Sequence, residues 1–206
     1  MVPMKSKILT LVILGLIAGL LGLWAAPAGA AHKPKAPIQI QATPLMKDGI
    51  HIQPWIDYPV PLDLKKAAKS AEAHGQDLLV LFEQPGCTYC KQLHEVNFID
   101  RPLVTYLVEN FMIVQVDIRS DKPMVDFEGK TISQAAFASS LKAAYTPTSV
   151  FFNEDGTEMF RLPGFIPTLF YRAALEYVTT GGPDTGAPFK AWLDANAGRL
   201  MKKFGG

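Results

Sequence analysis

The sequence has few cysteines and almost no net charge, and each shortage excludes a class of protein. Only 2 of the 206 residues are cysteine, too few for a small domain held together by several disulfides. The 20 basic and 19 acidic residues leave a net charge of +1, without the basic blocks of a nucleic-acid binder. Apolar residues make up 49%, which excludes a disordered chain. We therefore expect a globular domain that binds no nucleic acid.

Charge is missing altogether from the 24 residues 8–31, which follow Lys5 and Lys7. A basic start, an apolar stretch and the small residues Ala28-Gly29-Ala30 are typical of a secretory signal peptide cleaved after Ala30. The alternative for residues 1–30 is an uncleaved anchor, because such a stretch is long enough to cross a hydrocarbon core of about 30 Å. Both interpretations place the rest of the chain outside the cytoplasm, with membrane contact only through an uncleaved leader.

Composition divides the rest of the chain into three parts. Residues 31–61 hold six prolines and predict an extended lead-in with some β-like pieces. Residues 62–180 predict one domain. Residues 181–206 begin with a Gly/Pro-rich linker and continue as an amphipathic helix, whose apolar stripe is Phe189, Trp192, Leu193, Ala197, Leu200 and Phe204. This helix either docks on the domain or binds a partner or a membrane surface.

The hydrophobic pattern of residues 62–180 predicts an α/β domain. Strands are expected at 77–83, 111–118, 148–152 and 157–161. Helices are expected at 63–73, 87–98 (with Cys90, Leu93, Val96 and Asn97 in step), 102–110, 133–144 (capped by Ser133) and 167–178, and a loop at 119–132. Helical crossovers make the first two strands parallel and the turn at 153–156 makes the last two antiparallel. The result is a mixed central sheet flanked by helices.

Cys87-Thr88-Tyr89-Cys90 lies where the first strand turns into a helix. Two cysteines three apart at a helix start bring their sulfurs close enough for a disulfide. The helix N-terminus favours the Cys87 thiolate and lowers its pKa below the free value of about 8.5. Cys87 would attack a substrate disulfide and Cys90 would resolve the mixed disulfide, and the reverse reaction donates a disulfide. This chemistry supports either direction, and we expect no cofactor.

Two other roles compete with the redox role. A purely structural disulfide is disfavoured, because a four-residue ring constrains the unfolded chain little. A metal-binding or copper-delivery module would use Cys87, Cys90 and His94 as three ligands along one helix, although His94 alone is typical of a surface or packing residue. The redox role is the favoured hypothesis and the metal site stays open as the alternative.

These segments resemble the thioredoxin superfamily from about Leu62 to Val178. The resemblance rests on DLLVLFE, GCTYCKQL, IVQVDI, YTPTSVFFNEDG and Gly164. Within it, EQPGC, HEV, VDFEGK and PTSVFFNEDGTEMFRLPG are similar to the periplasmic SoxW-type thioredoxins associated with sulfur oxidation. The resemblance implies a thioredoxin fold and an exported, periplasmic thiol–disulfide oxidoreductase.

The resemblance also implies a substrate groove beside the cysteines. Pro147 matches the family's cis-proline, and Thr146 precedes it. Gly164 forms the other wall of the groove, and Thr88 and Tyr89 lie between the cysteines. Thioredoxins carry Gly-Pro between their cysteines, so Thr88-Tyr89 leaves the direction of electron flow open.

Glu83 has two interpretations. The buried acid of cytoplasmic thioredoxins corresponds to Leu81 in this chain, two residues before Glu83. Glu83 is therefore either the proton relay for Cys90 or a solvated carboxylate at the end of the strand.

The expected partners follow from the resemblance and the leader. A dithiol in an oxidising compartment becomes a disulfide unless it is reduced again, so a reductase there needs an inner-membrane electron donor. Its clients would be proteins with disulfides or thiols, such as sulfur-oxidation carriers or apocytochromes c. A disulfide oxidase or isomerase is the alternative, although residues 31–61 are short for the dimerisation domain of an isomerase.

Overall fold

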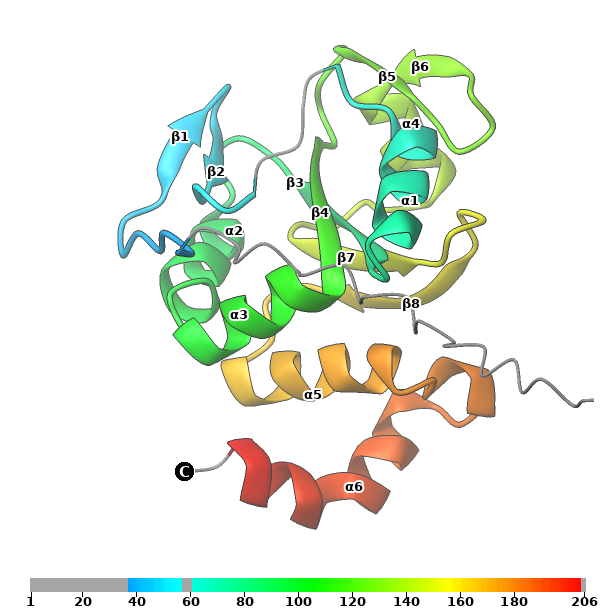
Figure 1. Cartoon of the computed structure of the whole chain (residues 1–206). Helices are drawn as coiled ribbons and strands as arrows, with labels where there is room; N and C mark the ends of the chain where they lie inside the picture. The colour runs from blue at the N-terminus through cyan, green and yellow to red at the C-terminus, as the bar shows by residue number, and fades with distance from the viewer. Residues whose placement is uncertain (1–36, 57–60, 205–206) are drawn as a thin grey trace, which may run out of the picture. The chain divides into compact units, whose positions relative to one another are not determined.

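The computed structural model describes residues 37–56 and 61–204, and a four-stranded mixed sheet lies at its centre (Figure 1). The strands follow the order β4-β3-β7-β8. They span Asp77–Glu83 (β3), Phe111–Asp117 (β4), Thr148–Phe152 (β7) and Glu158–Pro163 (β8). β3 runs parallel to β4 and antiparallel to β7, and β7 and β8 form a hairpin. The predicted mixed sheet is confirmed.

Helices cover both faces of this sheet (Figure 1). One face carries α1 (Leu64–Ala73) and α4 (Gln134–Ser140), and the other carries α3 (Arg101–Asn110) and α5 (Thr168–Thr179). A short helix, α2 (Thr88–Gln92), follows β3 and continues directly into a π-helical turn, η1 (Leu93–Asn97). The motif of two cysteines therefore starts at the end of the central strand β3.

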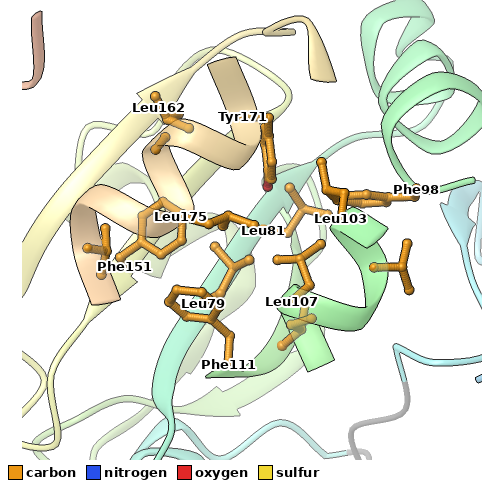
Figure 2. Close-up of a cluster of buried hydrophobic side chains, with 14 of the residues drawn as sticks. Leu79, Leu81, Phe98, Leu103, Leu107, Phe111, Phe151, Leu162, Tyr171 and Leu175 are labelled. Carbon is orange, nitrogen blue, oxygen red and sulfur yellow. The ribbon is translucent and has the colours of Figure 1, made fainter. Parts of the chain in front are cut away.

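Alternation along β3 divides the core into two clusters. Leu78, Val80 and Phe82 pack on the side of α1 and α4. Leu79 and Leu81 pack on the side of α3 and α5, as Figure 2 shows. All five side chains are buried, and full burial of one leucine contributes about 1.5–3 kcal/mol. Glu83 continues the series of Leu79 and Leu81, so its side chain lies on the α3 and α5 side.

The prediction of a plain loop at 119–132 is wrong. β5 (Pro123–Val125) and β6 (Thr131–Ser133) form a small antiparallel hairpin. The Asp126 carboxylate stabilises its turn by accepting hydrogen bonds from the N–H groups of Glu128 and Lys130, at 3.0 and 2.8 Å. Strands of three residues with one buried side chain, Met124, are too short to give a periodic signal.

Two helices differ in detail from their predictions. Ser133 caps α4 as expected, its Oγ accepting a hydrogen bond from the Ala136 N–H at 3.1 Å. The helix ends at Ser140 rather than at 144, because Lys142 takes a left-handed conformation with φ 56°. In the segment 87–98 the expected inward place of Val96 is wrong, since Val96 is 43% exposed and His94 is buried instead.

The described part of the lead-in, residues 37–56, contains a hairpin of β1 (Leu45–Lys47) and β2 (Ile50–Ile52). We call residues 37–56 the N-terminal segment. Just after β2, Gln53 is fully buried, and its amide donates hydrogen bonds to the carbonyl oxygens of Gln41 and His94, at 2.9 and 3.4 Å. The Trp55 ring packs edge-on against Phe98 with 5.1 Å between centroids. The N-terminal segment is therefore packed against η1.

The C-terminal extension contains a short 3-10 turn, η2 (Pro183–Thr185), and the helix α6 (Phe189–Phe204). Phe189 and Trp192 contact the Tyr177 ring of α5, with centroids 5.3 and 5.4 Å apart. Leu200 is buried as well. The prediction of a docked terminal helix is confirmed. Within residues 37–56 and 61–204, no helix has the length and apolar character to span a membrane.

A buried carboxylate joins α5 to α6. Glu176 accepts hydrogen bonds from Arg199 and from Lys203, the latter at 3.0 Å. Burial alone would raise the pKa of Glu176, but these two cationic donors outweigh burial and hold it below its ordinary value of 4.5. Because folding lowers this pKa, the ionised carboxylate stabilises the fold fully at pH values above the ordinary pKa. The stabilisation is lost as the pH falls through the lowered pKa of the folded state.

We predict that Glu176→Gln lowers the free energy of unfolding by about 1 kcal/mol at pH 7, because the two cations are half exposed and partly screened. At pH 3 the difference from the unsubstituted protein shrinks, because a carboxyl group whose pKa is lowered by folding contributes less stability as the pH falls below its ordinary value of 4.5. Urea unfolding at both pH values measures this. Asp194→Asn, which breaks the exposed pair with Lys190, is the matched control and should cost less at pH 7. An equal loss at both pH values would contradict the electrostatic account.

Candidate active site

The turn between β3 and α2 positions the first cysteine. Gly86 takes a φ of 73°, which side chains rarely adopt, and the next residue, Cys87, is the N-cap of α2. The N–H of Cys90 donates a hydrogen bond to the Cys87 sulfur at 3.0 Å. The sulfur thus takes the place of the oxygen that caps most helices, at the positive end of the helix.

Cys87 and Cys90 form a disulfide, as their spacing predicts, with 2.07 Å between the sulfurs and 5.2 Å between the Cα atoms. The two cysteines differ in accessibility, because Cys87 is 7% exposed and Cys90 is 0% exposed. Thr88 and Tyr89 between them are exposed. Of the two cysteines, only Cys87 therefore keeps any exposed surface.

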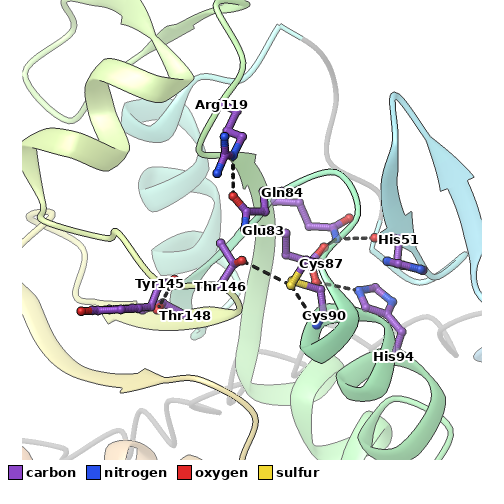
Figure 3. The surroundings of a disulfide bond; sticks show 11 residues. His51, Glu83, Gln84, Cys87, Cys90, His94, Arg119, Tyr145, Thr146 and Thr148 are labelled. Atoms are coloured by element: carbon purple, nitrogen blue, oxygen red, sulfur yellow. Dashed lines mark hydrogen bonds and ion pairs between the residues drawn. A yellow bond between two sulfur atoms is a disulfide. The ribbon is translucent and has the colours of Figure 1, made fainter.

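The loop before β7 lies against this disulfide (Figure 3). The Thr146 hydroxyl donates a hydrogen bond to the Cys87 sulfur at 3.2 Å, and the Thr146–Pro147 peptide is cis. The N–H of Gly164, which follows β8, donates to the Pro147 carbonyl oxygen at 2.7 Å. The residues predicted to line a groove thus come together at Cys87. The Tyr145 ring beside them is 77% exposed.

Glu83 is fully buried, so its interpretation as a solvated carboxylate is wrong. Its Oε1 lies 3.1 Å from Nε2 of His94. Its Oε2 accepts a hydrogen bond from Nε2 of Gln115 on β4, at 2.7 Å. Figure 3 shows Glu83 and His94 pointing toward each other beside the cysteine pair.

His94 is also fully buried, so the expectation of a surface residue is wrong and that of a packing residue is right. Its ring packs edge-on against Phe98, with 5.0 Å between centroids. In the parts of the chain that the structure describes, no three His, Cys, Asp or Glu side chains are grouped to hold a metal ion. Cys87, Cys90 and His94 are not arranged as metal ligands in this structure. The two sulfurs are bonded to each other, and Nε2 of the His94 imidazole faces Glu83.

Two further residues of this cluster, Gln115 and His51, belong to no sequence motif and were not predicted. Gln115 is the polar residue within the apolar run FMIVQVD, and that interruption is the signal that marks it. Its Nε2 also donates to the carbonyl oxygen of His51, at 2.8 Å. The His51 ring lies 5.8 Å from the ring of His94, and burial, followed by the neighbouring His94, lowers the pKa of His51. His51 has no sequence signal, because it reaches the site through the fold of the N-terminal segment.

We predict that Thr146→Val slows alkylation of Cys87 in the reduced protein about three- to tenfold at pH 6.5. The variant removes a hydroxyl that would donate to the reactive thiolate, and one such hydrogen bond contributes about 0.5–1.5 kcal/mol. Iodoacetamide labelling followed by mass spectrometry gives the rate. Thr148→Val is the matched control, because that hydroxyl donates to the Tyr145 carbonyl instead of to sulfur. Equal slowing in both variants would show a general disturbance of the loop.

Several solved structures are similar to this chain. A thioredoxin-fold protein from Helicobacter pylori is 22% identical with a TM-score of 0.55, over 62% of this chain and 86% of that one. A thioredoxin from Thermus thermophilus is 27% identical with a TM-score of 0.48, over 63% and 91%. The oxidised C-terminal domain of DsbD from Neisseria meningitidis is 20% identical with a TM-score of 0.43, over 55% and 90%.

The first of these likenesses bears on the fold alone. No curated protein matches the chain. The sequence profile of the thioredoxin-like domain matches residues 64–179, which is more than half of the chain and includes both cysteines. The sheet, its flanking helices and the disulfide at the start of α2 agree with this match. The chain therefore belongs to the thioredoxin-like domain family and has the thioredoxin fold.

Proposed function

We propose that this protein is an exported thiol–disulfide oxidoreductase that reduces disulfides of client proteins. The observation that carries the proposal is the disulfide at the N-terminus of α2, in which Cys87 keeps a small exposed surface and Cys90 has none. In the reduced protein, the Cys87 thiolate attacks a client disulfide and the first client sulfur leaves as a thiolate. Cys90 then loses its proton and attacks Cys87, which releases the second client thiolate. Two electrons pass from the pair to the client.

The groove around Cys87 supplies the contacts for this reaction. Thr146, Pro147 and Gly164 form its wall, where the backbone of an extended client can pair. Tyr89 and Tyr145, exposed at 61% and 77%, offer rings to the client's side chains. Contacts with these rings do not require one particular side chain, so clients of varied sequence can bind.

Glu83 is the group that takes the proton from Cys90 in this proposal. It is buried on the α3 and α5 side of β3, and both of its oxygens have partners. A carboxylate within reach of a buried thiol makes that thiol a better nucleophile by general base catalysis.

The location and partners rest on the sequence. The leader at residues 1–30 lies outside the described residues, and its pattern supports export to the periplasm. A reductase in that compartment needs an inner-membrane protein that returns electrons to Cys87 and Cys90. The stretches similar to SoxW-type thioredoxins favour sulfur-oxidation carriers as clients, and apocytochrome c thiols fit the same chemistry.

We expect Cys90→Ser to accumulate mixed disulfides with client proteins through Cys87, because the resolving thiol is gone. Cys87→Ser should accumulate none, since Cys90 is enclosed. Non-reducing gels of the osmotic-shock fraction of Gram-negative cells that express each variant measure this. The same fraction, analysed by mass spectrometry, should contain a chain that begins at Ala31. Trapping through Cys90 alone would reverse the assignment of the nucleophile, and recovery only in the cytoplasm would overturn export.

The direction of electron flow is tested by the reduction potential of the disulfide. A reductase should equilibrate near the thioredoxin value of about −270 mV, whereas a disulfide donor or isomerase lies toward about −120 mV. Equilibration in dithiothreitol and glutathione buffers, followed by gel-shift alkylation, gives the value. A potential at the oxidising end would replace the reductase with the oxidase or isomerase alternative.

A further inference from the structure

Glu83 and His94 are an unusual pair of residues to find inside an apolar domain. Both side chains are fully buried, and an ionised carboxylate taken out of water is costly unless hydrogen-bond donors surround it. Here both carboxylate oxygens have partners. His94 lies 3.1 Å from Oε1 and Gln115 donates to Oε2 at 2.7 Å. The surroundings are therefore built to hold Glu83 as an acceptor of protons.

The contact between Glu83 and His94 needs a proton between its two atoms. A carboxylate oxygen and an unprotonated imidazole nitrogen are both acceptors, so they approach to 3.1 Å only with a hydrogen in between. The other ring nitrogen of His94, Nδ1, is buried and has no hydrogen-bond partner among the described residues. This arrangement fits an imidazole that is protonated on Nε2 and donates to Glu83.

The helix geometry brings this pair to the enclosed cysteine. His94 follows Cys90 by four residues, so both lie on the same face of the continuous helix formed by α2 and η1. That face also meets Glu83, because Glu83 bonds to His94. Figure 3 draws the pair and the disulfide in the same small region.

The N-terminal segment closes the other side of the pair. Gln53 donates to the His94 carbonyl oxygen at 3.4 Å, and the ring of His51 lies 5.8 Å from the ring of His94. Gln115 links the two sides, since its amide donates to both His51 and Glu83. Other titratable groups near the pair include His51 on β2 and Tyr171 on α5, and Lys91 on α2 and Glu95 on η1 act on His51 as well.

We propose that His94 is a positioning residue of the redox reaction. Its Nε2–H holds Glu83 as a buried base for Cys90, and the N-terminal segment keeps that base away from water. This inference rests on the proposed function. When the mixed disulfide on Cys87 is resolved, the Cys90 proton passes to the Glu83 carboxylate. The Cys90 thiolate forms the S–S bond with Cys87, and the electron pair of the broken bond leaves on the client thiolate.

The test separates the two steps in the full-length reduced protein. Dithiobis(nitrobenzoate) reacts first with Cys87 and releases one coloured thiolate, and the attack of Cys90 then releases a second. The His94→Leu variant loses the partner of Glu83 Oε1, so we expect the second phase to slow at least tenfold while the first changes less than twofold. His94→Gln restores a donor and should recover most of the rate. The exposed His74→Leu is the matched control and should leave both phases unchanged.

Two further measurements distinguish positioning from packing. With Glu83 already replaced by Gln, adding His94→Leu should slow the second phase no further, because His94 acts only through Glu83. Gln115→Leu, which removes the other donor to Glu83, should slow the second phase in the same direction.

Three results would overturn the role of His94. The first is equal slowing of both phases in His94→Leu, and the second is an additive effect in the double variant. The third is an unchanged second phase in both His94→Leu and Gln115→Leu. If the unsubstituted protein releases no first thiolate, the oxidoreductase function itself fails.

Discussion

The burial of one carboxylate constrains the arrangement of the whole site. The side-chain alternation of β3 carries Glu83 into the same layer as Leu79 and Leu81, at the point where the strand ends. The neighbouring elements must then supply donors, and they do so from opposite directions, His94 from η1 and Gln115 from β4. Because these donors fix η1 against the sheet, they also fix the start of the same helix, where the cysteines lie.

Local patterns predicted the parts of the fold that depend on nearby residues. The run DLLVLFE is apolar on both sides and gives a central strand, and Ser133 has a side chain that can cap the helix it precedes. The spacing of Cys87 and Cys90 is itself local, so the disulfide could be predicted as well. A resemblance to a family added Thr146 and Gly164, which no local pattern marks.

The environment of Glu83 could not be predicted in this way. Its two interpretations differ only in what covers the end of β3. His94 and Gln115 contact Glu83 there, and both of them are hydrogen-bonded to the N-terminal segment, some 30 residues earlier in the chain. The three-residue strands β1, β2, β5 and β6 are also too short for a periodic pattern. Sequence patterns record the face that a residue prefers, whereas long-range contacts decide which segment meets that face.

The packing of the N-terminal segment and of α6 has a consequence for the size of the folding unit. The family profile matches residues 64–179, and Trp55 and Trp192 lie outside this range. Their rings nevertheless pack on Phe98 and Tyr177, which lie inside it. A chain cut at the profile boundaries would turn two aromatic contacts of the core into exposed apolar surface. The hydrophobic core of this protein therefore extends beyond the residues that the family profile covers, and both extensions contribute to it.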